Sequence, residues 1–416
     1  MNNKKGNVLA IGIMFFLFAM ISFVTGLQNP MGIIAKAQFG ATNLMSQLGN
    51  AANFIAYAFM GLPAGFLLKG KGYKFTALAA VAVGFVGVGI SYLSGVLGSF
   101  PVYLAGAFVS GFSMCMLNTV VNPLLNTLGG GGNKGNQLIQ LGGSLNSLSA
   151  TIVPVLAGYL IGEVTEKTQV ADVNPALFTA MGIFALAFVI ILCSYIPEPE
   201  LEAAAAEGEQ KKESTMESIK GALSYKNFVF GAIAIFLYVG IEVGIPNIAN
   251  LYMTDVNGLN IATGIAGTLV GAYWFLMLCG RLIAGAIGGK VSSRAMIIAV
   301  SAAGIIFLLA GMFLPKSIVV NVLDAQVPFA ILFFILCGLC TSVMWGAIFN
   351  LAVEGLGKYT SIASGLFMVM VCGGGILPLV QGAVVDYAGY MNSYWVLVAA
   401  LAFILWFGLI GSRTNK

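Results

Sequence analysis

Glu242 is the acidic residue that lies deepest in an apolar stretch of this sequence, FLYVGIEVGIPN (236–247). An ionised carboxylate inside a membrane span costs on the order of 3 kcal/mol or more, so such a group is expected to face a cavity and to have a task. It could hydrogen-bond a substrate hydroxyl, or it could carry a coupling proton. The alternative is a carboxyl group that stays protonated and bonds to a neighbouring helix.

Side-chain amides are the second group that could do chemistry. Asn118, Asn122 and Asn126 recur at a spacing of four in CMLNTVVNPLLN (115–126), which places them on one face of a helix. Pro123 removes a backbone hydrogen bond there, so Asn122 is expected to lie where the helix bends. Further amides lie in or beside other apolar segments: Gln28, Asn29, Gln47, Asn50, Asn53, Gln140, Asn146, Asn247, Asn350 and Gln381.

An amide carries both hydrogen-bond donors and acceptors, so a ring of amides matches the hydroxyl groups of a sugar. Aromatic residues that could stack on the C–H face of a sugar are Tyr238, Trp274, Trp345 and Phe349. For a single amide the alternative is a bond between helices, worth about 0.6 kcal/mol on average. So many amides on several segments of the N-terminal half indicate a polar cavity.

Catalytic and cofactor sites are disfavoured by what the chain lacks. It contains no histidine, which removes the usual general base and histidine-based metal or triad chemistry. Cys337-Gly-Leu-Cys340 has no second pair to complete a metal site. The glycine-rich pieces 129–136 and 355–361 lack the core of a phosphate-binding loop and any βαβ context. We therefore expect no enzyme, no catalytic residue, no metal site and no resident cofactor; a membrane-embedded sugar–lipid transferase would need more than one deep carboxylate.

The elements that must position these residues are membrane helices. Of 416 residues, 59% are hydrophobic and 8% charged, whereas soluble proteins are about 25% charged. Apolar runs long enough to cross a bilayer, which takes roughly 20 residues, recur along the chain. The short alternation typical of a membrane β-barrel is absent from the sequence. Twelve spans are predicted: 8–28, 44–68, 76–96, 101–126, 138–161, 175–196, 227–252, 262–288, 294–314, 326–353, 360–385 and 391–411. The first is interpreted as a retained helix rather than a cleaved signal peptide.

The polar stretch 197–226 divides the chain into two predicted six-helix bundles, 1–196 and 227–416. With the N-terminus placed in the cytoplasm, sixteen Lys and Arg residues fall on that side and three on the other. This bias predicts that both termini and the linker are cytoplasmic. It also accounts for the net charge of +4, which therefore gives no reason to expect nucleic-acid binding.

The two halves repeat each other. LSATIVPVLAGYLIG (148–162) parallels CGGGILPLVQGAVVD (372–386), and the basic loop PAGFLLKGKGYK (63–74) parallels IAGAIGGKVSSR (283–294). Two pseudo-symmetric six-helix halves with such loops resemble the major facilitator fold, an all-α membrane architecture in which the substrate site lies near mid-membrane between the halves.

The basic loops occupy the place of that superfamily's signature loop, Gly-x-x-x-Asp-Arg-x-Gly-Arg-Arg. Lys69 stands where the signature has Asp, and Arg281 with Arg294 belongs to the second copy. The resemblance implies that Lys69, Arg281 and Arg294 latch the cytoplasmic gate. The alternative is that they only anchor the topology.

More specific stretches resemble one branch of the superfamily, the fucose/glucose-galactose sugar–cation symporters. They are FLYVGIEVGI (236–245), YWFLMLCGRLIAG (273–285), the segment 350–382 and VVNPLLNTLG (120–129). The resemblance covers essentially the whole chain. It implies uptake of a monosaccharide across a bacterial inner membrane by a multi-pass protein that works as a monomer, with the sugar and the lipid bilayer as its partners.

One departure bears on coupling. Fucose-type members carry an Asp in helix 1 and a Glu in helix 4, where this sequence has Asn29 and Asn118. Neither can titrate, so proton coupling cannot run through them, although contacts with a sugar survive. The helix-5 Asn of the branch matches Asn146; for its preceding Gln, Gly143 falls in register and Gln140 lies one turn away.

We therefore expect a secondary transporter that imports a monosaccharide, a hexose or deoxyhexose such as glucose, galactose or fucose, by alternating access. The predicted sugar-binding residues are Gln28, Asn29, Asn118, Asn122, Asn146, Glu242, Asn350 and Gln381. Three hypotheses for coupling stay open: proton symport through Glu242, sodium symport through carbonyl and amide oxygens, and facilitated diffusion. Export of drugs or lipids would favour a large apolar cavity, which the amides speak against.

Overall fold

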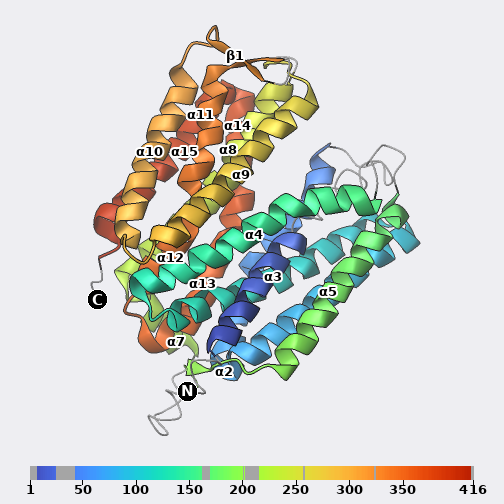
Figure 1. Cartoon of the computed structure of the whole chain (residues 1–416), viewed down its shortest axis with the longest axis vertical. Helices are drawn as coiled ribbons and strands as arrows, with labels where there is room; N and C mark the ends of the chain where they lie inside the picture. The colour runs from blue at the N-terminus through green and yellow to red at the C-terminus, as the bar shows by residue number, and fades with distance from the viewer. Residues whose placement is uncertain are drawn as a thin grey trace. The chain divides into compact units, whose positions relative to one another are not determined.

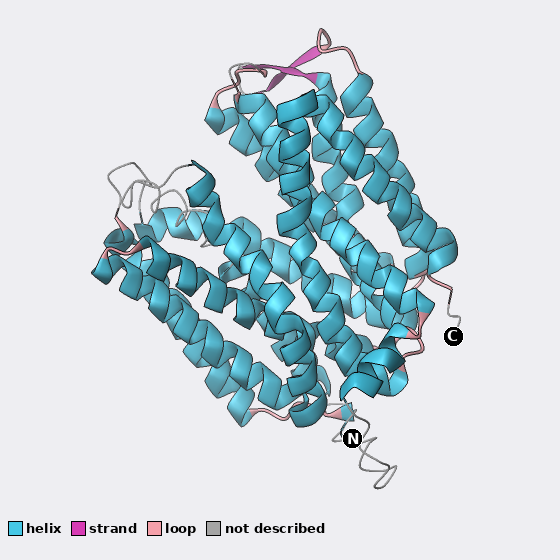
Figure 2. Cartoon of the chain, turned by 180° about the vertical axis from the view of Figure 1, so that it is seen from behind, coloured by secondary structure: helices cyan, strands magenta, loops and turns pink. Residues whose placement is uncertain are grey.

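The computed structural model of the chain describes residues 7–24, 43–161, 169–199, 201, 215–255, 258–322 and 325–413, and nearly all of them are helical (Figures 1 and 2). In this part of the chain, ten helices are long and apolar enough to cross a membrane. The chain is thus a multi-pass helical membrane protein, as the composition predicted.

Within its described residues, the first half of the chain contains five long helices. They are Asn7–Val24, α2 (Asn43–Leu97), α3 (Phe100–Leu128), α4 (Gly132–Ile161) and α5 (Asn174–Cys193), the last preceded by a 3₁₀ turn at Val170–Val173. The apolar part of α2, Ala51–Leu97, has 47 residues, more than twice the roughly 20 that one crossing needs. Gly72, with φ 81 and ψ −178, interrupts the helical backbone there, so α2 holds two of the predicted spans.

Among the described residues, the short helix α7 lies in the predicted linker, and the helices of the second half follow it. The elements are α7 (Thr215–Leu223), α8 (Lys226–Thr254), α9 (Thr263–Ile287), α10 (Ser293–Phe313), α11 (Phe329–Ser342), α12 (Met344–Val353), α13 (Thr360–Val369), α14 (Gly373–Ala388) and α15 (Tyr390–Trp406), with 3₁₀ turns at Gly357–Tyr359 and Met370–Cys372 and a π turn at Phe407–Gly411. α11 with α12, and α13 with α14, each form one broken span. α4 crosses the predicted span 138–161 but is not among the ten apolar spans counted above. With α4 added and α2 counted twice, the predicted twelve spans are accounted for.

A small β-hairpin was not predicted. β1 (Val319–Val322) pairs antiparallel with β2 (Ala325–Pro328), with Val320 opposite Val327, and Figure 2 shows it beyond the helix ends. β-Branched valines favour extended backbone, which explains why the span predicted to begin at 326 begins as a helix only at Phe329.

The chain forms two compact units. Unit 1 comprises residues 1–130, 145–222 and 356–370, and unit 2 comprises residues 131–144, 223–355 and 371–416. The main change of unit falls at Ala222–Leu223, inside the predicted linker. Two short segments belong to the unit of the opposite half: the start of α4 to unit 2, and the stretch with α13 to unit 1. The repeat that aligns 148–162 with 372–386 also aligns these two segments, so the exchange follows the internal symmetry.

Each unit is packed as membrane helices require. Where α2 meets α3 in unit 1, a Cβ on Gly87 would lie 2.6 Å from Ser110 Oγ, and one on Gly106 would lie 2.5 Å from Ser91 Oγ. Small residues permit this close approach, which replaces the hydrophobic force that lipid cannot supply. In unit 2, Phe334 of α11 stacks on Tyr394 of α15, with the ring centroids 4.2 Å apart.

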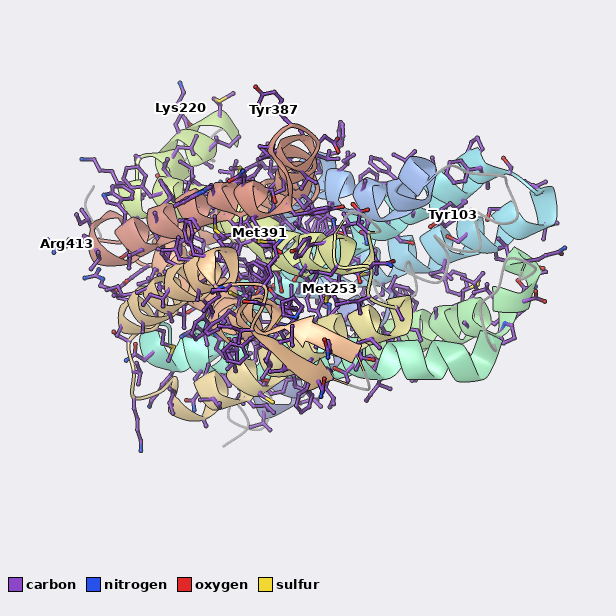
Figure 3. The ribbon with its side chains drawn as sticks, turned by 90° about the horizontal axis from the view of Figure 1, so that it is seen from above. Tyr103, Lys220, Met253, Tyr387, Met391 and Arg413 are labelled. Carbon is purple, nitrogen blue, oxygen red and sulfur yellow. The ribbon has the colours of Figure 1, made fainter. Side chains whose placement is uncertain are left out.

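Large apolar side chains cover the outside of the helices. Phe59, Ile306 and Phe313 are each more than 60% exposed, and Tyr387, at 95%, points away from the ribbon (Figure 3). Such a surface would be a liability in water and is the normal one in lipid.

Candidate coupling and sugar-binding site

An ion pair in unit 2 joins the deep carboxylate to a buried arginine. Arg281 Nη2 of α9 donates to Glu242 Oε1 of α8 over 3.2 Å, and the two side chains are 10% and 16% exposed. It is the only ion pair within the residues that the structure describes. The guanidinium also donates to the carbonyls of Gly143, at 3.1 Å, and Ser342, at 3.4 Å. Arg281, which the sequence pattern groups with the cytoplasmic basic loop, is therefore a buried partner of Glu242.

One backbone hydrogen bond of α8 is missing next to this pair. Pro246 has no N–H to donate to the carbonyl of Glu242, four residues earlier. The hydroxyl of Tyr273 on α9 donates to that carbonyl over 3.2 Å and lies 3.0 Å from Thr341 Oγ1 on α11. A side chain of the neighbouring helix α9 thus supplies the hydrogen bond that Pro246 removes, and the carbonyl that accepts it belongs to Glu242.

Two aromatic residues lie beside the ion pair. The Tyr238 side chain lies one turn before Glu242, and within the described structure its buried hydroxyl has no hydrogen-bond partner. Its ring packs edge-on against Trp345, with centroids 6.3 Å apart. Of the other predicted aromatic residues, Phe349 is fully buried and Trp274 is 37% exposed.

In unit 1 the amides of α3 form a connected line. Asn118 Nδ2 donates to the hydroxyl of Tyr57 over 3.0 Å, and Asn122 Nδ2 donates to the carbonyl of Asn118 over 2.9 Å. Asn122 is fully buried and Asn118 is 7% exposed. Asn146 of α4 donates from Nδ2 to the carbonyl of Phe18 over 2.9 Å. The predicted amides of this half therefore have protein partners, while Gln28 and Asn29 lie outside the described residues.

The two predicted amides of unit 2 differ in how they are satisfied. Asn350 Nδ2 donates to Ser293 Oγ over 2.9 Å. Gln381 of α14 is fully buried, and within the described structure neither its oxygen nor its nitrogen has a hydrogen-bond partner. It lies against Gly244 of α8, where a Cβ would come within 2.1 Å of Gln381 Oε1.

The comparisons with known proteins agree with this architecture. The family model described as Major Facilitator Superfamily matches residues 11–377.

The chain belongs to the major facilitator superfamily.

Curated relatives of the chain within the superfamily are named for sugars. A glucose/galactose transporter of Brucella abortus (strain 9-941) is 28% identical over 416 residues, covering 99% of this chain and 96% of the relative. The L-fucose-proton symporter of Escherichia coli (strain K12) is 21% identical over 414 residues, covering 95% of this chain and 90% of the relative. The crystal structure of a single-residue variant of the E. coli fucose:proton symporter matches with a TM-score of 0.83 at 19% identity, over 98% of this chain and all of that one.

The other predicted gating residues of this major facilitator protein bind neutral partners. Lys69 Nζ donates to the hydroxyl of Ser218 on α7, and Arg294 donates to the hydroxyl and carbonyl of Ser412 at 3.2 and 3.3 Å. The position that carries Asp in the signature loop thus ties α2 to the linker helix α7. The gating role itself stays a prediction.

The candidate site residues could be recognised in the sequence, but their hydrogen-bond partners could not. Tyr57, Tyr273 and Gly143 carry no signal of their own in an apolar sequence. Arg281 did carry one, since an arginine inside the predicted span 262–288 is as costly there as a carboxylate and should have been matched with Glu242.

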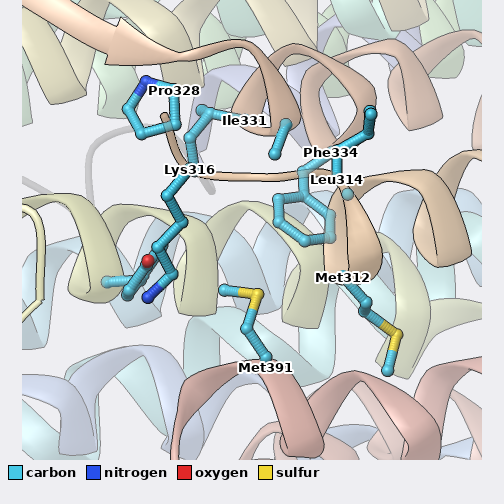
Figure 4. A pocket seen from close by; sticks show the side chains of 10 residues that line it. Met312, Leu314, Lys316, Pro328, Ile331, Phe334 and Met391 are labelled. Atoms are coloured by element: carbon cyan, nitrogen blue, oxygen red, sulfur yellow. The ribbon is translucent and has the colours of Figure 1, made fainter. Parts of the chain in front are cut away.

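A hollow at one end of unit 2 does not resemble a sugar site. Apolar side chains such as Phe334, Ile331 and Met391 line it, as Figure 4 shows. Lys316 lies over the ring of Tyr252 at its rim, 5.2 Å from the centroid. Because its lining contains no side-chain amide, the candidate residues remain those around Glu242 in unit 2 and, separately, the amides of α3 and α4 in unit 1.

Proposed function

We propose that this major facilitator protein imports a monosaccharide across the inner membrane of a bacterium, by alternating access and with protons as the coupling ion. The substrate is a hexose or deoxyhexose such as glucose, galactose or fucose, and the protein works as a monomer. The names of the relatives support the substrate class, because the similarity extends over nearly the whole chain. The buried pair of Glu242 and Arg281 carries the assignment of the coupling residue.

A carboxylate in such a pair has two states of different charge. With Glu242 ionised, the pair is neutral and is stable where water is scarce; with Glu242 protonated, Arg281 keeps an uncompensated charge. A proton therefore changes the electrostatics of the site by a full unit, which a conformational equilibrium can respond to. Asn118 cannot supply this change, so Glu242 takes the role that the helix-4 carboxylate has in fucose-type members.

The coupling test uses the purified protein in liposomes. With an imposed pH gradient, inside alkaline, labelled hexose should accumulate above its external concentration, and Glu242→Gln should abolish accumulation while sugar exchange at equal concentrations continues. Glu354→Gln changes an exposed carboxylate at the end of α12 and should leave accumulation unchanged. Full accumulation in Glu242→Gln would contradict proton coupling through this residue.

Uncoupled facilitation is the second candidate, and one observation favours it. The Glu242–Arg281 pair is already neutral without any added ion, so the site does not require a cation to be stable. Equilibration of the sugar without accumulation, under both proton and sodium gradients, would select this candidate. Accumulation under a sodium gradient alone would select sodium symport.

The substrate itself requires a competition experiment. Glucose, galactose, fucose, mannose and N-acetylglucosamine, each in excess, should be compared for their ability to block uptake of one labelled hexose. At least one monosaccharide should compete strongly, whereas an amphipathic drug should not. Competition by drugs alone would contradict the sugar assignment and favour an exporter.

A further inference from the structure

We propose that Arg281 is a positioning residue that ties the charge of Glu242 to the packing of residues 131–144, which include the start of α4, against the rest of unit 2. The inference rests on the proposed function, because it assumes that Glu242 changes its charge during transport. It adds a pathway from the carboxylate of Glu242 to α4, a helix that has no titratable group close to Glu242.

α4 is the helix that would respond to a change in the charge of Glu242. Its residues up to Ser144 belong to unit 2, while those from Leu145 belong to unit 1. Gly143 lies at this boundary, and its carbonyl accepts a hydrogen bond from Arg281 Nη1 over 3.1 Å. The guanidinium therefore holds α4 at the place where the helix passes from one unit to the other.

The remaining contacts of this segment with unit 2 involve neutral groups. Gln140 Nε2 donates to the carbonyl of Val343 over 2.7 Å, and Gln137 Nε2 donates to the carbonyl of Gly285 over 2.9 Å. Leu141 packs on Gly285, where a Cβ would come within 2.6 Å of its side chain. These bonds do not change with pH or with ion binding, so among the described contacts of the segment only the one with Arg281 can respond to Glu242.

The internal repeat shows that this contact is particular to unit 2. The alignment of the loop at 63–74 with that at 283–294 places Gly61 where Arg281 stands. Gly61 meets α13 through its backbone, since a Cβ there would lie 2.7 Å from the carbonyl oxygen of Gly365. In unit 1, a close backbone contact between Gly61 and α13 thus stands at the position where unit 2 has the charged Arg281.

The planar guanidinium explains why the two bonds depend on each other. Nη1 and Nη2 project from one rigid fork, so the group that holds Glu242 cannot turn without leaving Gly143. When Glu242 becomes neutral, the buried arginine loses the counter-charge of this carboxylate, and access of water then stabilises it. Arg281 is 8% exposed, and the start of α4 is part of its cover, so hydration requires residues 131–144 to move away.

The other titratable groups around Glu242 do not compete for this role. Arg281 bonds to its carboxylate, Tyr273 bonds to its carbonyl, and the Tyr238 hydroxyl, one turn earlier on α8, makes no hydrogen bond within the described structure. The segment 131–144 brings one charged residue, Lys134, which lies nine residues and therefore about 13 Å along the helix from Gly143. Among the described residues, Glu242 is thus the carboxylate that faces the guanidinium.

The test measures the docking directly, with a cysteine reporter. Ile139 is 1% exposed, and its side chain lies against Gly346, so a cysteine at this position becomes accessible only when the start of α4 leaves unit 2. The reporter is Ile139→Cys in a background with the exposed Cys193 replaced by serine. The matched control is Ile235→Cys, a fully buried position of α8 that reports general loosening.

Glu242→Gln should raise the maleimide labelling rate of Ile139→Cys about tenfold, within the range of coupling energies between sites, and leave that of Ile235→Cys unchanged. Relative to the labelling rate of Ile235→Cys at the same pH, which corrects for the smaller thiolate fraction, lowering the pH should raise labelling of Ile139→Cys in the parent and not in Glu242→Gln. Arg281→Lys, which keeps the charge and loses the fork, should show raised labelling at every pH. Adding Glu242→Gln to Arg281→Gln should raise labelling no further than Arg281→Gln alone.

Unchanged labelling of Ile139→Cys in both Glu242→Gln and Arg281→Gln would overturn the inference, as would equal increases at Ile139→Cys and Ile235→Cys. Sugar exchange at equal concentrations, measured on the same preparations, separates this outcome from a failure of the proposed function. A parent protein that exchanges no monosaccharide contradicts the function, whereas exchange without any labelling response contradicts only the role of Arg281.

Discussion

At the residue scale, Gln381 shows how stability and binding can oppose each other. Its amide is fully buried and, within the described structure, has no hydrogen-bond partner. Leaving such a group unsatisfied costs about 1–3 kcal/mol. Gly244 permits the arrangement, since any larger residue would meet the amide oxygen. A cost of this kind is expected where a side chain is held for a ligand.

Gln381→Met, which keeps the shape of the side chain without the polar atoms, should therefore stabilise the protein by about 1 kcal/mol and weaken sugar binding. Thermal unfolding in detergent, with and without saturating sugar, measures both effects. Asn227→Leu is the control, because Asn227 lies outside the predicted site and donates to the carbonyls of Leu351 and Ala352, so its loss should only destabilise. A stabilised variant with undiminished sugar binding would remove Gln381 from the site.

Tyr273 allows a second prediction at this scale. Its hydroxyl bonds to the carbonyl that Pro246 leaves free, so Tyr273→Phe should destabilise by about 1 kcal/mol. In a Pro246→Ala background the backbone supplies its own donor, and the same change should cost less. Chemical unfolding of the four proteins of this cycle gives the comparison, and equal costs in both backgrounds would refute the explanation.

At the element scale, the interruption of α2 is held by a carboxylate from the end of the sixth span. Glu198 accepts hydrogen bonds from the backbone N–H groups of Tyr73 and Lys74, at 2.6 and 2.8 Å. These are donors of the first turn after Gly72, which have no partner within their own helix. The side chain of Lys74 in turn donates to the carbonyls of Leu192 and Ser194 at the end of α5. The two helix ends thus satisfy each other.

Glu198→Ala should consequently destabilise unit 1 by about 1–3 kcal/mol, since two first-turn donors lose a charged acceptor. Gly72→Ala should destabilise too, because φ there is 81 and a Cβ would lie 2.3 Å from the carboxylate. Glu217→Ala, on the exposed side of α7, is the control that should have little effect. Thermal unfolding of the three variants tests this, and a Glu198→Ala protein as stable as the control would contradict it.

At the scale of the whole molecule, the uneven distribution of Lys and Arg predicts the orientation in the membrane. Both termini and α7 are expected in the cytoplasm, and the β1–β2 hairpin on the other side. A fluorescent protein fused after Lys416 should therefore fold and fluoresce, and a periplasmic phosphatase fused there should stay inactive. The reverse pattern would show that the positive-inside rule fails for this chain.

The sequence by itself determined the elements of this protein. Span number, the polar division at 197–226, the internal repeat and the deep position of Glu242 all follow from the length of apolar runs and the order of residues along the chain. Those properties are local, because a helix in lipid must satisfy its backbone within itself whatever its neighbours are. The hairpin at 319–328 escaped prediction because four-residue strands have no such length signal.

Only the tertiary structure decided which polar groups meet. Arg281 reaches Glu242 across 39 residues and Gly143 across 138, and no spacing rule connects positions so far apart. The exchange of residues 131–144 and 356–370 between the units cannot be predicted from the sequence either, since the apolar pattern of a helix does not depend on which neighbour it packs against. Apolar length specifies where a membrane helix lies along the chain, whereas the pairing of its few polar groups depends on which helices come into contact.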